Sequence, residues 1–430
     1  MVRFRRGLAA ARPCFFVILF LACCALLAAA PVRDLTWTDV APLRQLLAGH
    51  GINEDNLTAR LADIRARNLA RVVDGDRDHL VYYVLQSKEF TALPPIEPAI
   101  SAKEFASAGT VPANVRARIR AFTHEGTTSK STHAKTRSSI FREMMAREPV
   151  DLMKEYARAM RFAAPAGKEY QDRGLSTDST VDAGYVVYLS LSALRQLEPA
   201  RQIRTALVVG PGFDLAPRTG LVEAGAPQSY QPFAVMDALI ASGLSSRDTL
   251  RMTSADINPR VTEWIRGVRG APPTLSLVAG IREQGRIRLT EDYREYFARL
   301  GRAIGSEVPL RGLEPGRLGK SIAVAGAVTG AIDAETLDIT AERLDARYDL
   351  IVVTNVFPYL SDAELLLAMG NIAGMLAPGG VLIHNEPRPA LADALHVLGM
   401  PLLQSRSGVI ARDGDAPPFY DAAWTHRGPF

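Results

Sequence analysis

The chain has 430 residues, which is enough for two domains or for one domain with large insertions. Hydrophobic residues make up 47% of it, so a packed core is expected and wholesale disorder is excluded. The 50 Lys and Arg residues exceed the 46 Asp and Glu residues by four, and the four arginines before position 31 account for this excess. The remainder is neutral, so its charge gives no reason to expect nucleic acid as a partner.

The first 30 residues have the parts of a secretory signal peptide: a basic start, an apolar run from Cys14 and small residues before Pro31. The protein is therefore expected to be exported, either periplasmic or secreted. Two alternatives are an uncleaved membrane anchor formed by residues 14–30 and lipidation at Cys23 or Cys24. All three cysteines lie in this segment, so the rest of the chain cannot contain disulfides, thiolate metal sites or a cysteine nucleophile.

Residues 31–199 are predicted to form a mostly helical N-terminal domain. Apolar residues recur at helical spacing from Leu57, and further helices are expected over 79–88, 115–122, 140–161 and 181–197. Residues 91–98 contain three prolines, and residues 125–133 are small and polar. Both stretches are predicted to be loops, as is the stretch 167–182.

Residues 200–430 alternate strands with helices, which is typical of an α/β sheet. The expected strands lie near 205–210, 250–256, 334–339, 349–354 and 379–384, and the expected helices near 233–242, 258–268 and 361–376. Residues 402–410 and 419–426 are predicted to form a C-terminal β-hairpin. Residues 270–333 do not fit this alternation, and we interpret them as an insertion with one helix over 291–304.

Several apolar runs in this half end in residues suited to ligand binding. The run 207–209 leads into Gly210-Pro211-Gly212, a turn that lets backbone approach a ligand. Asp256 and Asp338 follow two further apolar segments, and Asn355 follows the run 348–354. The carboxyl ends of parallel strands meet at one edge of a sheet, so these residues predict a nucleotide-type cofactor site there.

This ordered set resembles class I S-adenosylmethionine-dependent methyltransferases, whose fold is a Rossmann-like, doubly wound and mostly parallel sheet. The most specific part of the likeness is the Tyr348-Asp349 strand followed by a helix and Leu376-Ala377-Pro378-Gly379-Gly380. The resemblance implies that the glycine turn passes under the methionine part of S-adenosylmethionine, that Asp256 accepts both ribose hydroxyls and that Asp338 lies near the adenine. The implied cofactor residues are Gly210, Pro211, Gly212, Phe213, Asp214, Asp256, Ile257, Asp338, Ile339 and Asn355.

The chain departs from the family pattern in three respects. Val208 occupies the position of the usual acid, two residues before the first glycine, and Asp214 occupies that of the third glycine. Asp256 also comes unusually far after the turn, because a long loop, 215–232, intervenes. Residues 228–231 of this loop either line the pocket or lie on the surface, and Asp214 could contact the amino group of the cofactor.

Methyl transfer requires an acceptor held in line with the methyl group and shielded from water. Tyr359, His384 and Glu386 are candidate catalytic residues near the sheet edge, although Tyr359 could serve packing and His384 could be a satisfied strand-end histidine. The seven histidines show no paired spacing for a metal, so no metal site is expected. A small, partly apolar acceptor molecule suits the neutral charge and the tyrosines of the insertion.

Two further interpretations stay open at this stage. An exported methyltransferase would lack its cytoplasmic methyl donor, so the domain could be a catalytically inactive binding module. A nicotinamide oxidoreductase is disfavoured, because Leu215 stands where the third glycine of a G-x-G-x-x-G turn should be.

Overall fold

A computed structural model describes residues 31–87, 90–94, 113–124, 132–147, 174–175, 181–215, 225–310, 312–313 and 315–429. The signal peptide expected over 1–30 lies outside these residues. So do most of the loops expected over 125–133 and 167–182, and the helix expected over 140–161 beyond residue 147. Of the helices in the described ranges, none is both long and apolar enough to span a lipid bilayer.

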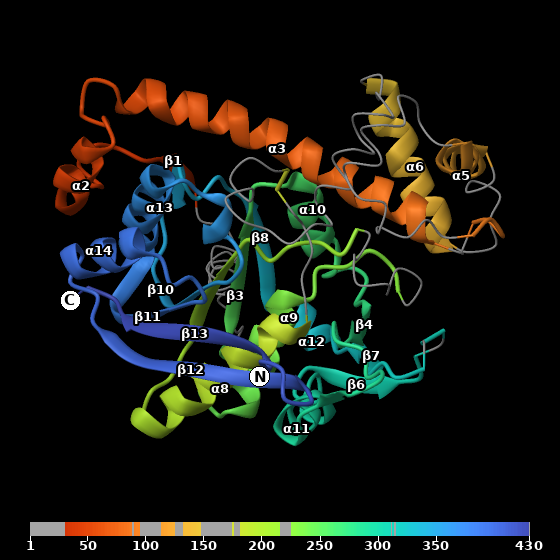
Figure 1. Ribbon diagram of the computed structural model, residues 1–430. Helices are drawn as coiled ribbons and strands as arrows, with labels where there is room; N and C mark the ends of the chain where they lie inside the picture. Colours follow the sequence, from red (N-terminus) through yellow and green to blue (C-terminus); the bar gives the residue numbers. More distant parts are fainter. Residues whose placement is uncertain are drawn as a thin grey trace, which may run out of the picture.

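An eight-stranded sheet forms the centre of the C-terminal half (Figure 1). Its strands, in spatial order, are β5 (Ile287–Leu289), β12 (Leu402–Asp413), β13 (Phe419–Arg427), β11 (Leu376–His384), β10 (Tyr348–Val353), β2 (Thr205–Val209), β3 (Arg251–Asp256) and β8 (Ile332–Thr336). The five strands from β11 to β8 run parallel, and β13 is antiparallel to both of its neighbours. The predicted α/β fold, its parallel strands and its closing hairpin are confirmed.

Strand side chains alternate between two cores, one on each face of the sheet. In β2, Ala206 and Val208 face the first core, whereas Leu207 and Val209 face the second. The first core is covered by α8 (Val181–Leu197), α9 (Gln231–Ala241) and α10 (Pro259–Gly267). The second is covered by α2 (Arg44–Gly49), α13 (Asp362–Met375) and α14 (Pro389–Val397). Helices on both faces explain why the parallel strands are continuously apolar.

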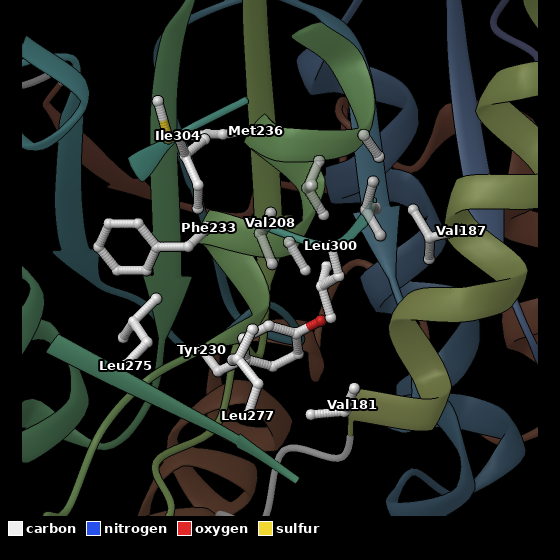
Figure 2. Close-up of a cluster of buried hydrophobic side chains, with 14 of the residues drawn as sticks. Val181, Val187, Val208, Tyr230, Phe233, Met236, Leu275, Leu277, Leu300 and Ile304 are labelled. Carbon is white, nitrogen blue, oxygen red and sulfur yellow. The ribbon is translucent and has the colours of Figure 1, made fainter. Parts of the chain in front are cut away.

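Figure 2 shows how tightly the first core joins the sheet, the helices and the insertion. Val208 of β2 lies among Phe233 of α9, Val187 of α8 and Leu300, and all four side chains are buried. The insertion is more regular than expected. It contains a three-stranded antiparallel sheet of β4 (Thr274–Val278), β7 (Gly319–Val324) and β6 (Gly305–Val308), besides α11 (Glu291–Arg299) and α12 (Gly326–Thr329).

Two sequence expectations about helix length were wrong. Helix α11 ends at Arg299 rather than near 304, because Leu300 is extended and Gly301 adopts a φ of 86°. The two helices expected over 57–64 and 79–88 form one helix, α3 (Leu57–Gln86), that crosses the molecule above the sheet (Figure 1). The apolar residues at the start of α3 and those at its end lie on different faces of the helix. This change of face made the sequence of one helix resemble that of two.

The other N-terminal elements attach at the two ends of α3. A short strand, β1 (Val32–Asp34), pairs with β9 (Glu342–Leu344), and η2 (Ala41–Leu43) leads into α2. At the far end, α5 (Ala113–His124) and α6 (Thr132–Arg147) pack against α3. Arg118 of α5 donates to the carbonyl oxygens of Val84 and Ser87, which caps the end of α3.

Candidate functional site

A cavity opens at the carboxyl ends of β2, β3, β8 and β10, and we call it the sheet-edge cavity. It is lined by strand-end residues and by helix α3: Asn68, Val72, Leu175, Ala183, Val209, Gly210, Gly212, Gln231, Ala255, Asp256, Ile257, Asn258, Leu337, Asp338, Ile339, Thr340, Thr354, Asn355, Val356, Tyr359 and Leu360. Seven of the ten residues expected to bind a cofactor lie in this lining. The edge of a doubly wound sheet is where ligands bind in this architecture.

The glycine turn after β2 needs glycine at both positions. Gly210 and Gly212 adopt φ angles of 65° and 72°, which disfavour any residue with a Cβ. The Gly210 N–H donates to the Ala255 carbonyl oxygen at 2.8 Å, so the turn is held against the end of β3. A Cβ on Gly210 would lie 2.4 Å from Cγ2 of Val356. The turn therefore packs closely against Val356, and a residue with a Cβ does not fit there.

Asp256 lies directly beside this turn. Its Oδ1 accepts the Asn258 N–H at 2.8 Å, and its Oδ2 accepts the Gly212 N–H at 3.4 Å. Burial raises the pKa of Asp256 to about 7, against the effect of these two hydrogen bonds, and the nearby charge of Asp76 adds to the rise. The Gly212 N–H thus places the glycine turn in direct contact with Asp256, as expected from the sequence.

Asp338 also lines the cavity, two residues after β8, the strand that pairs with β3. Its Oδ1 accepts the N–H of Thr340 at 3.0 Å and the hydroxyl of Thr340 at 2.6 Å. Its Oδ2 accepts from Nδ2 of Asn68, on α3, at 3.1 Å. Ile257 and Ile339 add apolar wall on the two sides of the cavity. Two carboxylates and an apolar lining between them suit a flat, polar-edged group.

The end of β10 contributes polar groups to the third side. Asn355 has a φ of 60°, and it exchanges two hydrogen bonds with Asn385, at 2.9 and 2.8 Å. The Thr354 hydroxyl accepts from the Gln231 side chain of α9. Tyr359, on the short turn η4 (Phe357–Tyr359), completes this wall. An asparagine in the left-handed region, fixed by a second asparagine, is typical of a functional loop.

Helix α3 covers the cavity, and the sequence analysis did not predict this. Asn68 and Val72 line the cavity, and Arg71 donates to the Tyr359 carbonyl oxygen at 3.1 Å. Asp76 accepts from Asn258 Nδ2 at 3.0 Å and forms an ion pair with Arg260 at 3.3 Å. A cluster of polar residues in the middle of an otherwise amphipathic helix was the available signal.

Three residues expected near the cofactor lie outside the lining. Pro211 and Phe213 are buried, and the Phe213 ring packs on Trp264 with centroids 6.2 Å apart. Asp214 is buried too, and its N–H donates to the Gln228 carbonyl oxygen at 2.7 Å. These contacts hold the turn against the first core. Asp214 does not line the cavity in which a cofactor amino group would lie.

Residues 228–231 are all buried, so the alternative that they lie on the surface is wrong. Gln231 lines the cavity. Gln228 instead exchanges hydrogen bonds with the backbone of Ser276 in β4, at 2.7 and 2.8 Å, and so ties the loop to the insertion. Arg137 of α6 is fully buried and donates to the carbonyl oxygens of Leu215 and Gly225 at 2.6 and 3.1 Å.

The candidate catalytic residues are divided between two cavities. Tyr359 lines the sheet-edge cavity. His384 and Glu386 line a second one, beside α14. The Phe357 ring of η4 lies near His384, with centroids 6.2 Å apart. Strand alternation explains the placement of His384, since Leu382 points into the second core and His384 follows it on the same face.

The sheet, the turn and the two acids define the class of this domain. Its parallel strands follow the doubly wound order, with β8-β3-β2 on one side and β10-β11 on the other. An antiparallel last strand inserted beside the fifth is the arrangement of class I methyltransferases. Residues 200–430 therefore have the fold of class I S-adenosylmethionine-dependent methyltransferases.

Within that class, residues 320–402 match the family of nodulation protein S, NodS. The nodulation protein S of Rhizobium tropici is 44% identical over 54 residues, which are 12% of this chain and 23% of that protein. The aligned stretch thus spans less than a quarter of this curated relative. The family match over residues 320–402 includes Asp338, Asn355 and Tyr359.

The chain is also similar to solved structures of methyltransferases. N-methyltransferase NodS from Bradyrhizobium japonicum WM9, in complex with S-adenosylhomocysteine, is 16% identical and covers 61% of this chain and 97% of its own, with a TM-score of 0.30. The magnesium protoporphyrin IX methyltransferase from Synechocystis PCC 6803, with bound S-adenosylmethionine, is 10% identical and covers 67% and 95%, with a TM-score of 0.28.

Proposed function

We propose that this protein is an S-adenosylmethionine-dependent methyltransferase that acts on a small-molecule acceptor in the sheet-edge cavity. The observation that carries the proposal is the direct contact between the glycine turn and Asp256, in one cavity with Asp338. A turn that admits backbone to a ligand and a buried acid beside it are the parts that an adenosyl group requires.

The residues present fit this cofactor. Each carboxylate oxygen of Asp256 receives one backbone N–H and keeps a free lone pair, so the group can also accept two ribose hydroxyls. Asp338 retains acceptor capacity for the adenine amino group beside its bonds to Thr340 and Asn68. Gly210 and Gly212 line the cavity without side chains, so the methionine part could pass close to their backbone.

When bound, S-adenosylmethionine supplies a methyl group already activated on a sulfonium. The protein then has to position the acceptor and keep water out. Helix α3 and Leu360 close the cavity from above, and Asn355 and Tyr359 form the wall beside the end of β10. We propose that Asn355 and Tyr359 contact the acceptor, because they have polar groups at this wall.

We infer that the acceptor atom is a nitrogen. Residues 320–402 match the NodS family, and NodS from Bradyrhizobium japonicum is described as an N-methyltransferase. An amine that enters the cavity must be unprotonated to attack, so methyl transfer to an amine should rise with pH. The neutral charge of the chain after residue 30 suits a small acceptor rather than a polyanion.

Calorimetry with S-adenosylhomocysteine tests cofactor binding, and transfer from methyl-labelled S-adenosylmethionine to a panel of amines, alcohols and carboxylates tests the reaction. D256A should abolish cofactor binding. D237N is the matched control, because Asp237 is also a buried acid with a pKa raised by burial but lies outside the cavity. A folded protein that binds neither cofactor form would overturn the proposal, whereas binding without transfer would identify a binding module.

We also propose that residues 1–30 direct export. The four arginines before an apolar run support this, and the small residues before Pro31 support cleavage there. The N-terminal mass of the protein recovered from fractionated cells measures both. An intact N-terminus in the cytoplasmic fraction would reject the proposal.

A further inference from the structure

Gln231, the first residue of α9, brings a side-chain amide to the sheet-edge cavity, which it lines although it is only 7% exposed. Its Nε2 donates to the Thr354 hydroxyl at the end of β10. In the parallel sheet, Val353 pairs with Val209. The residues that follow, Thr354 and Gly210, therefore leave the sheet edge side by side. The amide thus lies beside the glycine turn, where the methionine part of the cofactor would pass.

The oxygen of this amide is open to the cavity. Because Nε2 is bound to Thr354, Oε1 is the free end of the amide, and it accepts no hydrogen bond from a described residue. It is not sealed inside the protein, in contrast to Oε1 of Gln404, which is buried without a partner among the described residues. Since Gln231 lines the sheet-edge cavity, its accessible oxygen faces that cavity. An acceptor with two lone pairs is therefore available to a bound molecule.

The neighbouring side-chain oxygens are already engaged. The Thr354 hydroxyl accepts from Gln231, and Asn355 Oδ1 accepts from Asn385 Nδ2 at 2.8 Å. The two carboxylates of the lining bind the nucleoside in the proposed function. Oε1 of Gln231 is therefore the acceptor best placed to hold the molecule that receives the methyl group.

The rest of the lining indicates the chemistry of that molecule. Val72, Leu175, Ala183 and Val356 give the cavity apolar walls that suit an apolar body. None of the described lining residues is Lys, Arg or His, so an acceptor molecule with a carboxylate or phosphate would find no cation there. An uncharged molecule with an N–H donor matches both the apolar walls and the amide oxygen.

We propose that Gln231 binds the N–H group of an amine acceptor, so that the protein methylates molecules with an apolar body and a nitrogen that carries hydrogen. The inference rests on the proposed function. An amide oxygen suits this role better than a carboxylate, because it does not hold the amine in its unreactive ammonium form. Amines without an N–H would lack this contact.

The contact strengthens as the reaction proceeds. The nitrogen lone pair forms the new N–C bond, while the C–S bond breaks and its electron pair stays on sulfur. The nitrogen becomes positively charged, so its N–H donates more strongly to Oε1 of Gln231. The proton leaves to water after transfer. A bond that is stronger in the transition state than in the bound amine raises the rate of transfer.

The binding test compares aniline with toluene, in which a methyl group replaces the amino group. Ligand-observed NMR titration measures the affinity of both for the full chain loaded with S-adenosylhomocysteine. Q231M removes the amide and should lower the aniline-to-toluene affinity ratio about 2- to 12-fold, the effect of one neutral hydrogen bond. Q231E keeps an oxygen towards the cavity and should retain the ratio, whereas an amide that donated to the ligand could not be replaced in this way.

Methyl transfer gives a second readout. Thiophenolate has no hydrogen on its nucleophilic atom, so Q231M should slow transfer to aniline about 10- to 150-fold relative to transfer to thiophenolate, the effect of one hydrogen bond from a charged donor. Q404M is the matched control. Gln404 is also buried and donates through Nε2, to the Ser190 carbonyl oxygen at 2.7 Å, but it lies outside the cavity. This variant should leave both ratios unchanged.

The outcomes separate this inference from the proposed function. An aniline-to-toluene ratio that is unchanged in Q231M, falls equally in Q404M or is lost in Q231E would overturn the inference. So would a cofactor-loaded protein that does not bind aniline, that transfers no methyl group to it, or whose aniline-to-thiophenolate rate ratio is unaffected by Q231M. A folded protein that does not bind S-adenosylhomocysteine overturns the proposed function, and the inference with it.

Discussion

The affinity for S-adenosylhomocysteine should depend on pH through Asp256. Its pKa is raised to about 7 by burial, and ribose hydroxyls donate to the ionised carboxylate rather than to the acid. The ionised fraction falls from about 90% at pH 8 to about 10% at pH 6, so the dissociation constant should rise about tenfold between these values. Binding at pH 6 should also release about 0.9 protons, since the ligand selects the ionised form.

Calorimetry at pH 6, 7 and 8 measures the affinity, and repeating it in buffers with different ionisation enthalpies measures the released protons. D256N cannot ionise, so its weaker binding should be independent of pH in this range. D76N removes a neighbouring charge that raises the pKa of Asp256, so it should move the transition to lower pH. A flat profile in the unmodified protein, or a profile that survives in D256N, would refute the reasoning.

Three other variants test the remaining geometry. G210A should lose cofactor binding and about 2–4 kcal/mol of stability, because its Cβ adds backbone strain and overlaps with Val356. The control G399A has a similar φ and no atom near its new Cβ, so it should lose about 1 kcal/mol and bind normally. Thermal unfolding measures the stability of both variants, and calorimetry measures their cofactor binding. N68A removes the hydrogen bond from α3 to the Asp338 carboxylate and should weaken S-adenosylhomocysteine binding about threefold, as measured by calorimetry. An unchanged affinity would contradict the role of the helix in the site. Burial lowers the pKa of His384 to about 3. Near pH 6.5 this histidine therefore becomes protonated in the unfolded chain but stays neutral in the folded one, so the free energy of unfolding should fall by about 2 kcal/mol between pH 7.5 and 5. Urea unfolding should show that H384F lacks this loss.

The strand ends and the turn could be predicted from the sequence because local backbone dictates their residues. Only glycine suits the φ angles at Gly210 and Gly212, and the apolar runs end where the sheet ends. The Asp349 of the Tyr-Asp motif has a role within the sheet, since its carboxylate accepts the N–H groups of Arg204 and Thr205, at the start of the adjacent strand β2, at 2.8 and 3.0 Å. Each of these residues is required by the strand on which it lies or by its neighbour.

The division of the candidate catalytic residues could not be predicted in this way. Strand alternation gives the face to which His384 points, but the cavity on that face exists only because α14 and the loop at Met400 are placed around it. Tyr359 lies before α13 and His384 before α14, and the sequence places both near the sheet edge. Only tertiary packing assigns them to different cavities, Tyr359 to the sheet-edge cavity and His384 to the cavity beside α14.

Helix α3 shows why a long helix can hide a functional segment from sequence analysis. Its first part buries Leu57 and Leu61 in the second core, and its last part buries Leu80 and Tyr83 in the first. Between them most of the buried side chains are polar, although Ile64 and Val72 are buried too, and Asn68 and Asp76 meet residues that lie 270 and 182 positions away in the chain. A purely structural brace would bury apolar groups there as well, because these fill a core without needing partners. The polar middle instead matches the polar mouth of the sheet-edge cavity, so the helix joins two cores and closes the site between them.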